Sequence, residues 1–133
     1  RGLNLGPGER RFVLPPAAAA STVAFQTSVG LGARERDGMI GVIATLKVAE
    51  GKNAEFEAIF TDLAKQVRAN EPGNLAYQLT KSRTDGQVYK VLELYKDQDA
   101  LVAHGGTDYF KAAGAKMGPC MGGRPEIEYL DGV

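Results

Sequence analysis

Apolar and polar residues alternate along residues 39–49 (MIGVIATLKVA). A period of two predicts a β-strand with one apolar face. That face consists of Ile40, Val42, Ala44, Leu46 and Val48. The opposite face carries Ile43 among smaller and polar residues.

The next segment, residues 50–70 (EGKNAEFEAIFTDLAKQVRAN), repeats its large apolar residues every three or four positions. This spacing predicts an amphipathic α-helix with one apolar stripe. Asn53 is a suitable N-cap, and Pro72 cannot continue the helix, so we expect the helix to end at Asn70. The stripe consists of Phe56, Ile59, Phe60, Leu63 and Val67.

Two more alternating segments, residues 74–82 and 88–96, flank the pair Asp85-Gly86. A short polar turn of this kind between two apolar runs predicts a β-hairpin. After the hairpin we expect two short helical segments and a last strand. These are residues 97–104 capped by Asp97, residues 107–118 capped by Thr107, and the strand at residues 124–132.

The order β-α-β-β-α-β predicts an α+β, ferredoxin-like fold with a four-stranded antiparallel sheet and both helices on one face. We expect the other face to carry Ile43, Tyr89, Val91 and Tyr95. An apolar sheet face without helices predicts a homodimer packed through the sheets. The alternatives are that the surface tolerates these residues, or that the N-terminal segment covers them.

Residues 1–38 differ in composition from residues 39–133, and the change predicts a boundary at Met39. The first segment is rich in Gly, Pro and Ala and contains no Lys or Tyr. It has some features of a signal peptide, although Pro15 and Pro16 interrupt its apolar part. It could also be a natural extension that docks on the body or on a partner. The change in composition favours a third interpretation, in which Met39 is the true start and the preceding residues come from an expression vector or a misplaced start codon.

Overall charge argues against nucleic-acid and membrane partners, because sixteen basic residues balance sixteen acidic ones. No apolar run approaches the roughly 18 residues that span a bilayer. Cys120 is the only cysteine, so an internal disulfide or a cysteine metal cluster is excluded. A lone cysteine is typical of a reducing compartment, and we expect a cytoplasmic protein. No HExxH or other metal-ligand spacing is present, and we expect no metal.

His104 is the only histidine in the chain and therefore a candidate general base. Because His104 lies between an alanine and two glycines, it could equally be a surface or helix-capping residue. Glu93 lies in the middle of a predicted strand, where we expect a solvated cross-strand partner of a lysine.

Residues 40–130 resemble the antibiotic biosynthesis monooxygenase domain family, which includes small quinol monooxygenases. The resemblance rests on the order and spacing of three motifs. A histidine follows the short helix in the family pattern, as His104 does here. The family often has a second histidine before a Phe, where this chain has Asp108, and often a Cys at the position of Asn74. The three motifs are KVAEGKNAEFEAIF, EPGNLAYQL and YKVLELYKDQDALVAHGGTDYF.

The resemblance implies a dimeric α+β barrel with a pocket between sheet and helices, and oxygen chemistry without a metal or flavin. The expected function is that of a cofactor-independent monooxygenase that oxidises a small aromatic quinol or polyketide-like substrate with O₂. An electron-rich phenol can itself reduce O₂ once it is deprotonated, so the protein needs only an apolar pocket, a base and hydrogen-bonding groups.

In this interpretation His104 takes the proton, while Asn74, Tyr77 and Tyr109 supply hydrogen bonds. The pocket walls are expected to be Phe56, Phe60, Leu63, Phe110 and Met117. The same apolar residues also fit an ordinary core, and Asn74 after Gly73 also fits a turn.

Three other functions fit the same fold. One is an isomerase of a small sugar-like or hydroxyketone metabolite, and another is a non-catalytic ligand-binding protein. The third, haem degradation, is disfavoured because the chain has no Trp. Fold resemblance does not by itself choose among these.

Overall fold

The computed structural model describes residues 38–133, so the interpretations of the N-terminal segment lie outside the described residues. The element order β-α-β-β-α-β is confirmed, with the second helical region divided in two. The elements are β1 (Ile40–Lys47), α4 (Asn53–Asn70), β2 (Asn74–Lys81), β3 (Val88–Tyr95), α5 (Gln98–Gly105), α6 (Asp108–Met117), the 3₁₀ turn η1 (Gly118–Cys120) and β4 (Glu126–Asp131).

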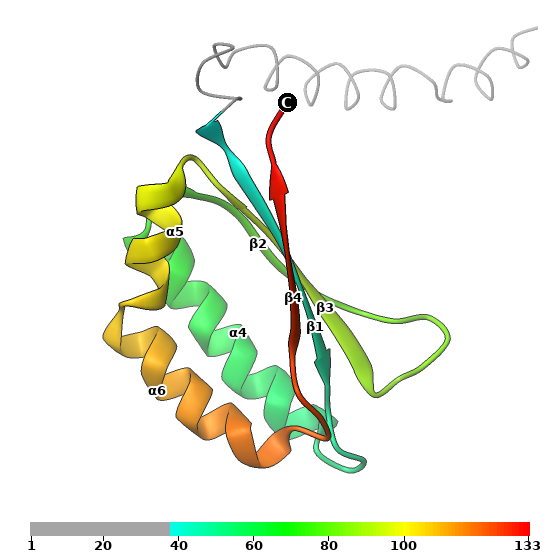
Figure 1. The fold of residues 1–133 in the computed structure, drawn as a ribbon. Coiled ribbons are helices and arrows are strands. Elements are labelled where there is room, and N and C mark those ends of the chain that lie inside the picture. The colour runs from blue at the N-terminus through cyan, green and yellow to red at the C-terminus, as the bar shows by residue number, and fades with distance from the viewer. Residues whose placement is uncertain (1–37) are drawn as a thin grey trace, which may run out of the picture. The chain divides into compact units, whose positions relative to one another are not determined.

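The four strands form one antiparallel sheet in the order β2-β3-β1-β4, and the helices form a layer on one side of it (Figure 1). This arrangement confirms the ferredoxin-like α+β fold that the sequence predicts. None of the helices among residues 38–133 combines the length and the hydropathy that a membrane span requires. The predicted cytoplasmic location is not tested by this finding.

Two of the three predicted helix caps are confirmed. The Asp97 side chain accepts a hydrogen bond from the Ala100 amide, and Thr107 accepts one from the Phe110 amide. The predicted cap of α4 is wrong, because Lys52 precedes the helix and makes no side-chain cap. The Asn53 amide instead donates to the hydroxyl oxygen of Tyr89 at 2.8 Å, so it ties the start of α4 to β3.

The core lies between α4 and the inner face of the sheet. The apolar stripe of α4 is buried as expected, with Phe56 and Val67 both fully inaccessible to solvent. The Phe56 ring lies 4.9 Å, between centroids, from the ring of Tyr89. Burial of side chains of this size contributes about 1.5–3 kcal/mol each, so this stripe is the main attachment of α4 to the sheet.

The prediction that Tyr89, Val91 and Tyr95 lie on the open face of the sheet is wrong. All three are buried on the helix side, with exposures of 2% or less. The antiparallel register pairs Val91 with Ala44 and Tyr89 with Leu46, and directly opposed residues share a face. The side chains of Tyr89, Glu93 and Tyr95 therefore belong to the inner face of β3.

The face away from the helices nevertheless has an apolar centre. Ile43 pairs with Leu92, and Gly41 pairs with both Leu94 and Leu130. Leu92 and Leu130 are 43% and 42% exposed. We call Ile43, Leu92, Leu94 and Leu130 the open-face patch, and it takes the place of the patch expected from the sequence.

Candidate functional site

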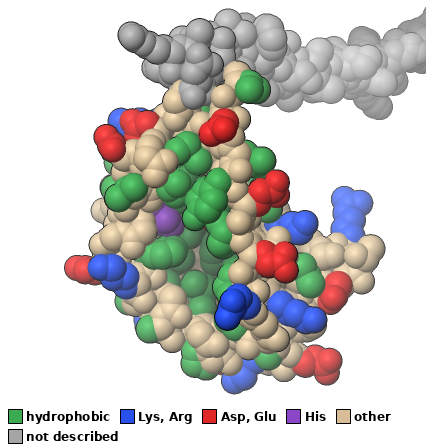
Figure 2. Space-filling model, in the orientation of Figure 1, with side chains coloured by type: hydrophobic (Ala, Val, Ile, Leu, Met, Phe, Trp, Pro, Cys, Tyr) green, Lys and Arg blue, Asp and Glu red, His purple; other side chains and the backbone are tan. Residues whose placement is uncertain are grey.

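An apolar cavity of about 750 Å³ lies between the inner face of the sheet and the three helices. Its size falls in the range that holds a small organic ligand. Its open side runs along β4, where Ile127 and Tyr129 are 47% and 64% exposed although they face inward. Figure 2 shows apolar side chains gathered around this hollow, with the histidine at its wall.

Six of the predicted site residues line the cavity. α4 supplies two of them, β2 one, α5 one and α6 two. They are Phe60, Leu63, Tyr77, His104, Phe110 and Met117. The predicted pocket wall is thus assembled from four elements.

Three predicted site residues lie elsewhere. Phe56 belongs to the core beneath the first turns of α4 and does not line the cavity. Asn74 and Tyr109 line a separate, more polar depression of about 640 Å³, together with Glu71 and Lys96. The structure therefore places no contact between Asn74 or Tyr109 and the interior of the cavity, and their substrate-binding role stays a prediction.

His104 is held rigidly in the cavity wall. Its side chain comes from the last turn of α5, and the residue is only 4% exposed. Aromatic rings surround it, with centroid distances of 4.5 Å to Phe110, 5.1 Å to Tyr77 and 5.5 Å to Tyr95. A surface position, the alternative left open by the sequence, does not describe this residue.

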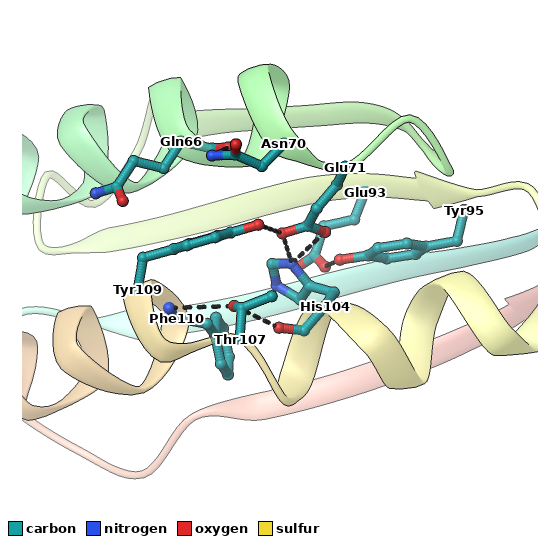
Figure 3. A network of polar contacts seen from close by, with 9 residues as sticks. All are labelled: Gln66, Asn70, Glu71, Glu93, Tyr95, His104, Thr107, Tyr109 and Phe110. Atoms are coloured by element: carbon teal, nitrogen blue, oxygen red, sulfur yellow. Dashed lines mark hydrogen bonds and ion pairs between the residues drawn. The ribbon is translucent and has the colours of Figure 1, made fainter.

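Glu71, the residue that caps the C-terminal end of α4, holds one edge of the His104 ring. Nδ1 of His104 lies 3.0 Å and 3.2 Å from the two carboxylate oxygens of Glu71. The Tyr109 hydroxyl donates to the same carboxylate (Figure 3). The Glu71 side chain is about as buried as the ring, with 10% of it exposed.

This contact decides which nitrogen of His104 is free. A carboxylate only accepts hydrogen bonds, so Nδ1 carries the proton and donates it to Glu71. In the neutral form of the ring Nε2 holds the lone pair, and it makes no hydrogen bond with any residue from 38 to 133. A neutral imidazole with a free Nε2 on a cavity wall is suited to accept a proton from a ligand.

Glu93 is an ionisable residue of β3 whose position on the inner face of the sheet differs from the prediction. The prediction of a solvated partner of a lysine is wrong, because Glu93 pairs with Val42 and Tyr77 and lines the cavity. The Tyr95 hydroxyl donates to its carboxylate at 2.6 Å (Figure 3). Burial and the nearby charge of Glu71 raise the pKa of Glu93 to about 7, against the opposing effect of the Tyr95 hydrogen bond.

The tyrosines of the site stay protonated at neutral pH. Burial, with a further contribution from neighbouring carboxylates, raises the pKa of Tyr77 and of Tyr95 far above the usual range. Burial and the hydrogen bond to Glu71 raise the pKa of Tyr109 to about 12. All three hydroxyls are therefore hydrogen-bond donors rather than bases.

Among residues 38–133, no group of three His, Cys, Asp or Glu side chains is arranged to hold a metal ion. Cys120, the last residue of η1, is fully buried and does not line the cavity. The absence of a metal and of any other cofactor stays a prediction from the sequence.

A family model described as antibiotic biosynthesis monooxygenase matches residues 39–116. A crystal structure from Caulobacter crescentus CB15, named as a candidate antibiotic biosynthesis monooxygenase, is 67% identical, with a TM-score of 0.72 over 75% of this chain and 94% of that one. No curated protein matches the chain.

Two more distant structures share the fold. A conserved protein from Methanosarcina mazei Go1 is 23% identical, with a TM-score of 0.70 over 75% of this chain and 98% of that one. A candidate antibiotic biosynthesis monooxygenase from Nitrosomonas europaea is 21% identical, with a TM-score of 0.70 over 73% of this chain and 92% of that one.

Proposed function

Because this chain belongs to the antibiotic biosynthesis monooxygenase family, we propose that it is a cofactor-independent monooxygenase. The proposed substrate is a small aromatic quinol or polyketide-like ring, and the co-substrate is O₂. The observation that carries the proposal is the position of His104, whose Nδ1 is bound to Glu71 while its ring lines an apolar cavity.

The first step is removal of a proton from a substrate hydroxyl. The O–H bond breaks, the proton goes to Nε2 of His104, and the electron pair stays on the substrate as a phenolate. Glu71 stabilises the imidazolium that forms, because its carboxylate is 3.0 Å from Nδ1. The two side chains are only 5% and 10% exposed, which makes this charge pairing stronger than it would be in solvent.

The substrate anion then supplies the electrons for oxygen chemistry. A ring carbon forms a bond to O₂ and is oxidised, while O₂ is reduced to a peroxide attached to that carbon. The outer oxygen is protonated and the hydrogen on the same ring carbon leaves as a proton. The O–O bond then breaks, so that the carbon keeps the inner oxygen as a carbonyl and the outer oxygen leaves as water. For a hydroquinone the balance is one quinol and one O₂ giving one hydroxyquinone and one water. The imidazolium of His104 is placed to return its proton to the leaving oxygen.

We also propose that the protein works as a homodimer. The open-face patch supports this, because Leu92 of β3 and Leu130 of β4 are exposed on either side of β1 on a face without helices. A two-fold axis through such a face would bring two patches together sheet against sheet. The cavities lie on the opposite, helix-covered faces, so this packing leaves them free.

An isomerase of a small hydroxyketone is the second candidate. It is favoured by one observation, namely that two ionisable side chains, His104 and Glu93, line the same cavity. A pair of acid–base groups can move a proton from one carbon of a substrate to another. The mostly apolar walls fit an aromatic ring better than a sugar-like chain.

Oxygen consumption tests the two candidates directly. Chelator-treated protein is mixed with a panel of hydroquinones and anthrones in an oxygen electrode, and the rate is corrected for autoxidation without protein. We expect uptake that is proportional to protein concentration with at least one substrate. An absence of uptake over the whole panel, together with interconversion of a hydroxyketone, would support the isomerase instead.

A further inference from the structure

The carboxyl group of Glu93 gives the cavity a second place where a proton can be accepted. β3 points this side chain toward the helices, and the hydroxyl of the fully buried Tyr95 donates to it at 2.6 Å. The other carboxylate on the cavity lining, Asp131, is exposed at the end of β4. Glu93 is therefore the half-buried, inward-facing carboxyl group of the lining, and His104 is the buried imidazole.

Two separate proton acceptors match the chemistry of one of the two proposed substrate classes. A hydroquinone that becomes a quinone loses one proton from each of two hydroxyl groups, which are attached to different ring carbons. An anthrone-type ring loses two hydrogens from one carbon, and its phenolic tautomer has a single hydroxyl, on the former carbonyl carbon. Two separate acceptors on the cavity lining therefore match the first class, in which the two protons leave from opposite ends of the ring.

We propose that Glu93 is a second catalytic base, and that the substrate is therefore an aromatic diol of the hydroquinone type. This inference rests on the proposed function. His104 takes the proton of one hydroxyl, and the carboxylate of Glu93 takes the proton of the other, so that both O–H bonds break inside the cavity. Conversion of the two deprotonated hydroxyls to carbonyls releases two electrons, and the ring C–H bond that becomes C–OH supplies two more. Together they reduce O₂ to the inserted oxygen and water, and the two protons leave with that water.

The groups around Glu93 determine the pH at which it can act. Tyr95 faces it from its own strand, and Glu71 from the end of α4 and His104 from α5 lie near it (Figure 3). Tyr77 is its pairing partner on β2. Because burial and the charge of Glu71 raise the pKa of Glu93 to about 7, the carboxyl group already holds a proton below that pH. Turnover of a diol should rise with pH through about 7.

The test compares Glu93→Gln with wild type on two substrates. The amide keeps the size of the side chain and an acceptor for the Tyr95 hydroxyl, but it cannot take a proton. We expect kcat for a hydroquinone to fall about 100-fold with little change in KM, and the rise of the pH profile near 7 to disappear. With an anthrone the two proteins should be equal, and Glu50→Gln, an exposed carboxylate in the turn before α4, should change neither substrate.

Equal rates of Glu93→Gln and wild type on the hydroquinone, or an equal loss on both substrates, would overturn the inference. If the wild-type protein consumes no oxygen at all, the proposed function fails, and binding under anaerobic conditions still tests Glu93. Hydroquinone should then bind about tenfold more tightly than 4-methoxyphenol, its monomethyl ether, because only the diol can donate to both groups. Glu93→Leu should remove this preference, and equal affinities in the wild-type protein would contradict the inference.

Discussion

Replacing His104 with glutamine is expected to lower kcat for oxygen uptake by about 100- to 10,000-fold, the range seen when a general base is removed. Glutamine can still form hydrogen bonds from this position, but it cannot accept the proton of a phenol. The measurement is the initial rate in an oxygen electrode at saturating quinol. Substrate binding without oxygen should change little, because the walls of the cavity are intact. A variant that keeps more than half of the wild-type rate would contradict the role of His104.

Glu71→Gln keeps the base, His104, and tests the residue that positions it. The amide can turn either its oxygen or its NH₂ group toward Nδ1, so it no longer fixes which nitrogen of His104 carries the proton. We expect a smaller loss of kcat, about tenfold, an unchanged KM and a shifted pH profile. Tyr109→Phe is the matched control, because it removes the other hydrogen bond of Glu71 and leaves the His104 contact in place.

Converting Leu92 to glutamate is expected to dissociate the proposed homodimer, raising its dissociation constant at least about 100-fold. Leu92 is 43% exposed at the centre of the open-face patch, and a two-fold axis would bring two such charges into one apolar interface. An unpaired charge without water costs several kcal/mol, which exceeds the contribution of a leucine.

Sedimentation velocity at micromolar concentration measures this change. The wild-type protein should sediment as a dimer and Leu92→Glu as a monomer with an unchanged far-UV circular dichroism spectrum. Ala54→Glu, which adds the same charge on the exposed side of the first turn of α4, should remain dimeric. A wild-type protein that is monomeric under these conditions would contradict the sheet-to-sheet interface.

The periodic segments of the sequence were sufficient to predict the elements and their order. The strand over residues 39–49 and the helix with the stripe from Phe56 to Val67 each have one apolar face. Each of them can therefore pack against the core in only one orientation. β3 lacks this asymmetry, because Leu92 and Leu94 on one face are matched by Tyr89 and Val91 on the other. Its orientation depends on the register with β1, which no local pattern reveals.

The site was predictable only in part, for a similar reason. His104 stands out as the only histidine, and the apolar walls follow from the helix stripes. Glu71 is 33 residues away from His104 in the chain, and next to Pro72 it resembles an ordinary helix end. The signal that would have found Glu93 is the face of β3. Once Val91 is on the inner face, Glu93 must be there too, two residues further along the strand.

Labelled oxygen tests the proposed function, in which one oxygen atom of O₂ is inserted into an aromatic substrate without a cofactor. Chelator-treated protein is incubated with a hydroquinone under ¹⁸O₂, and the product is analysed by mass spectrometry. We expect a hydroxyquinone that carries one ¹⁸O atom, with the other ¹⁸O atom in water. An unlabelled quinone, with all of the oxygen recovered as hydrogen peroxide or not consumed at all, would contradict it.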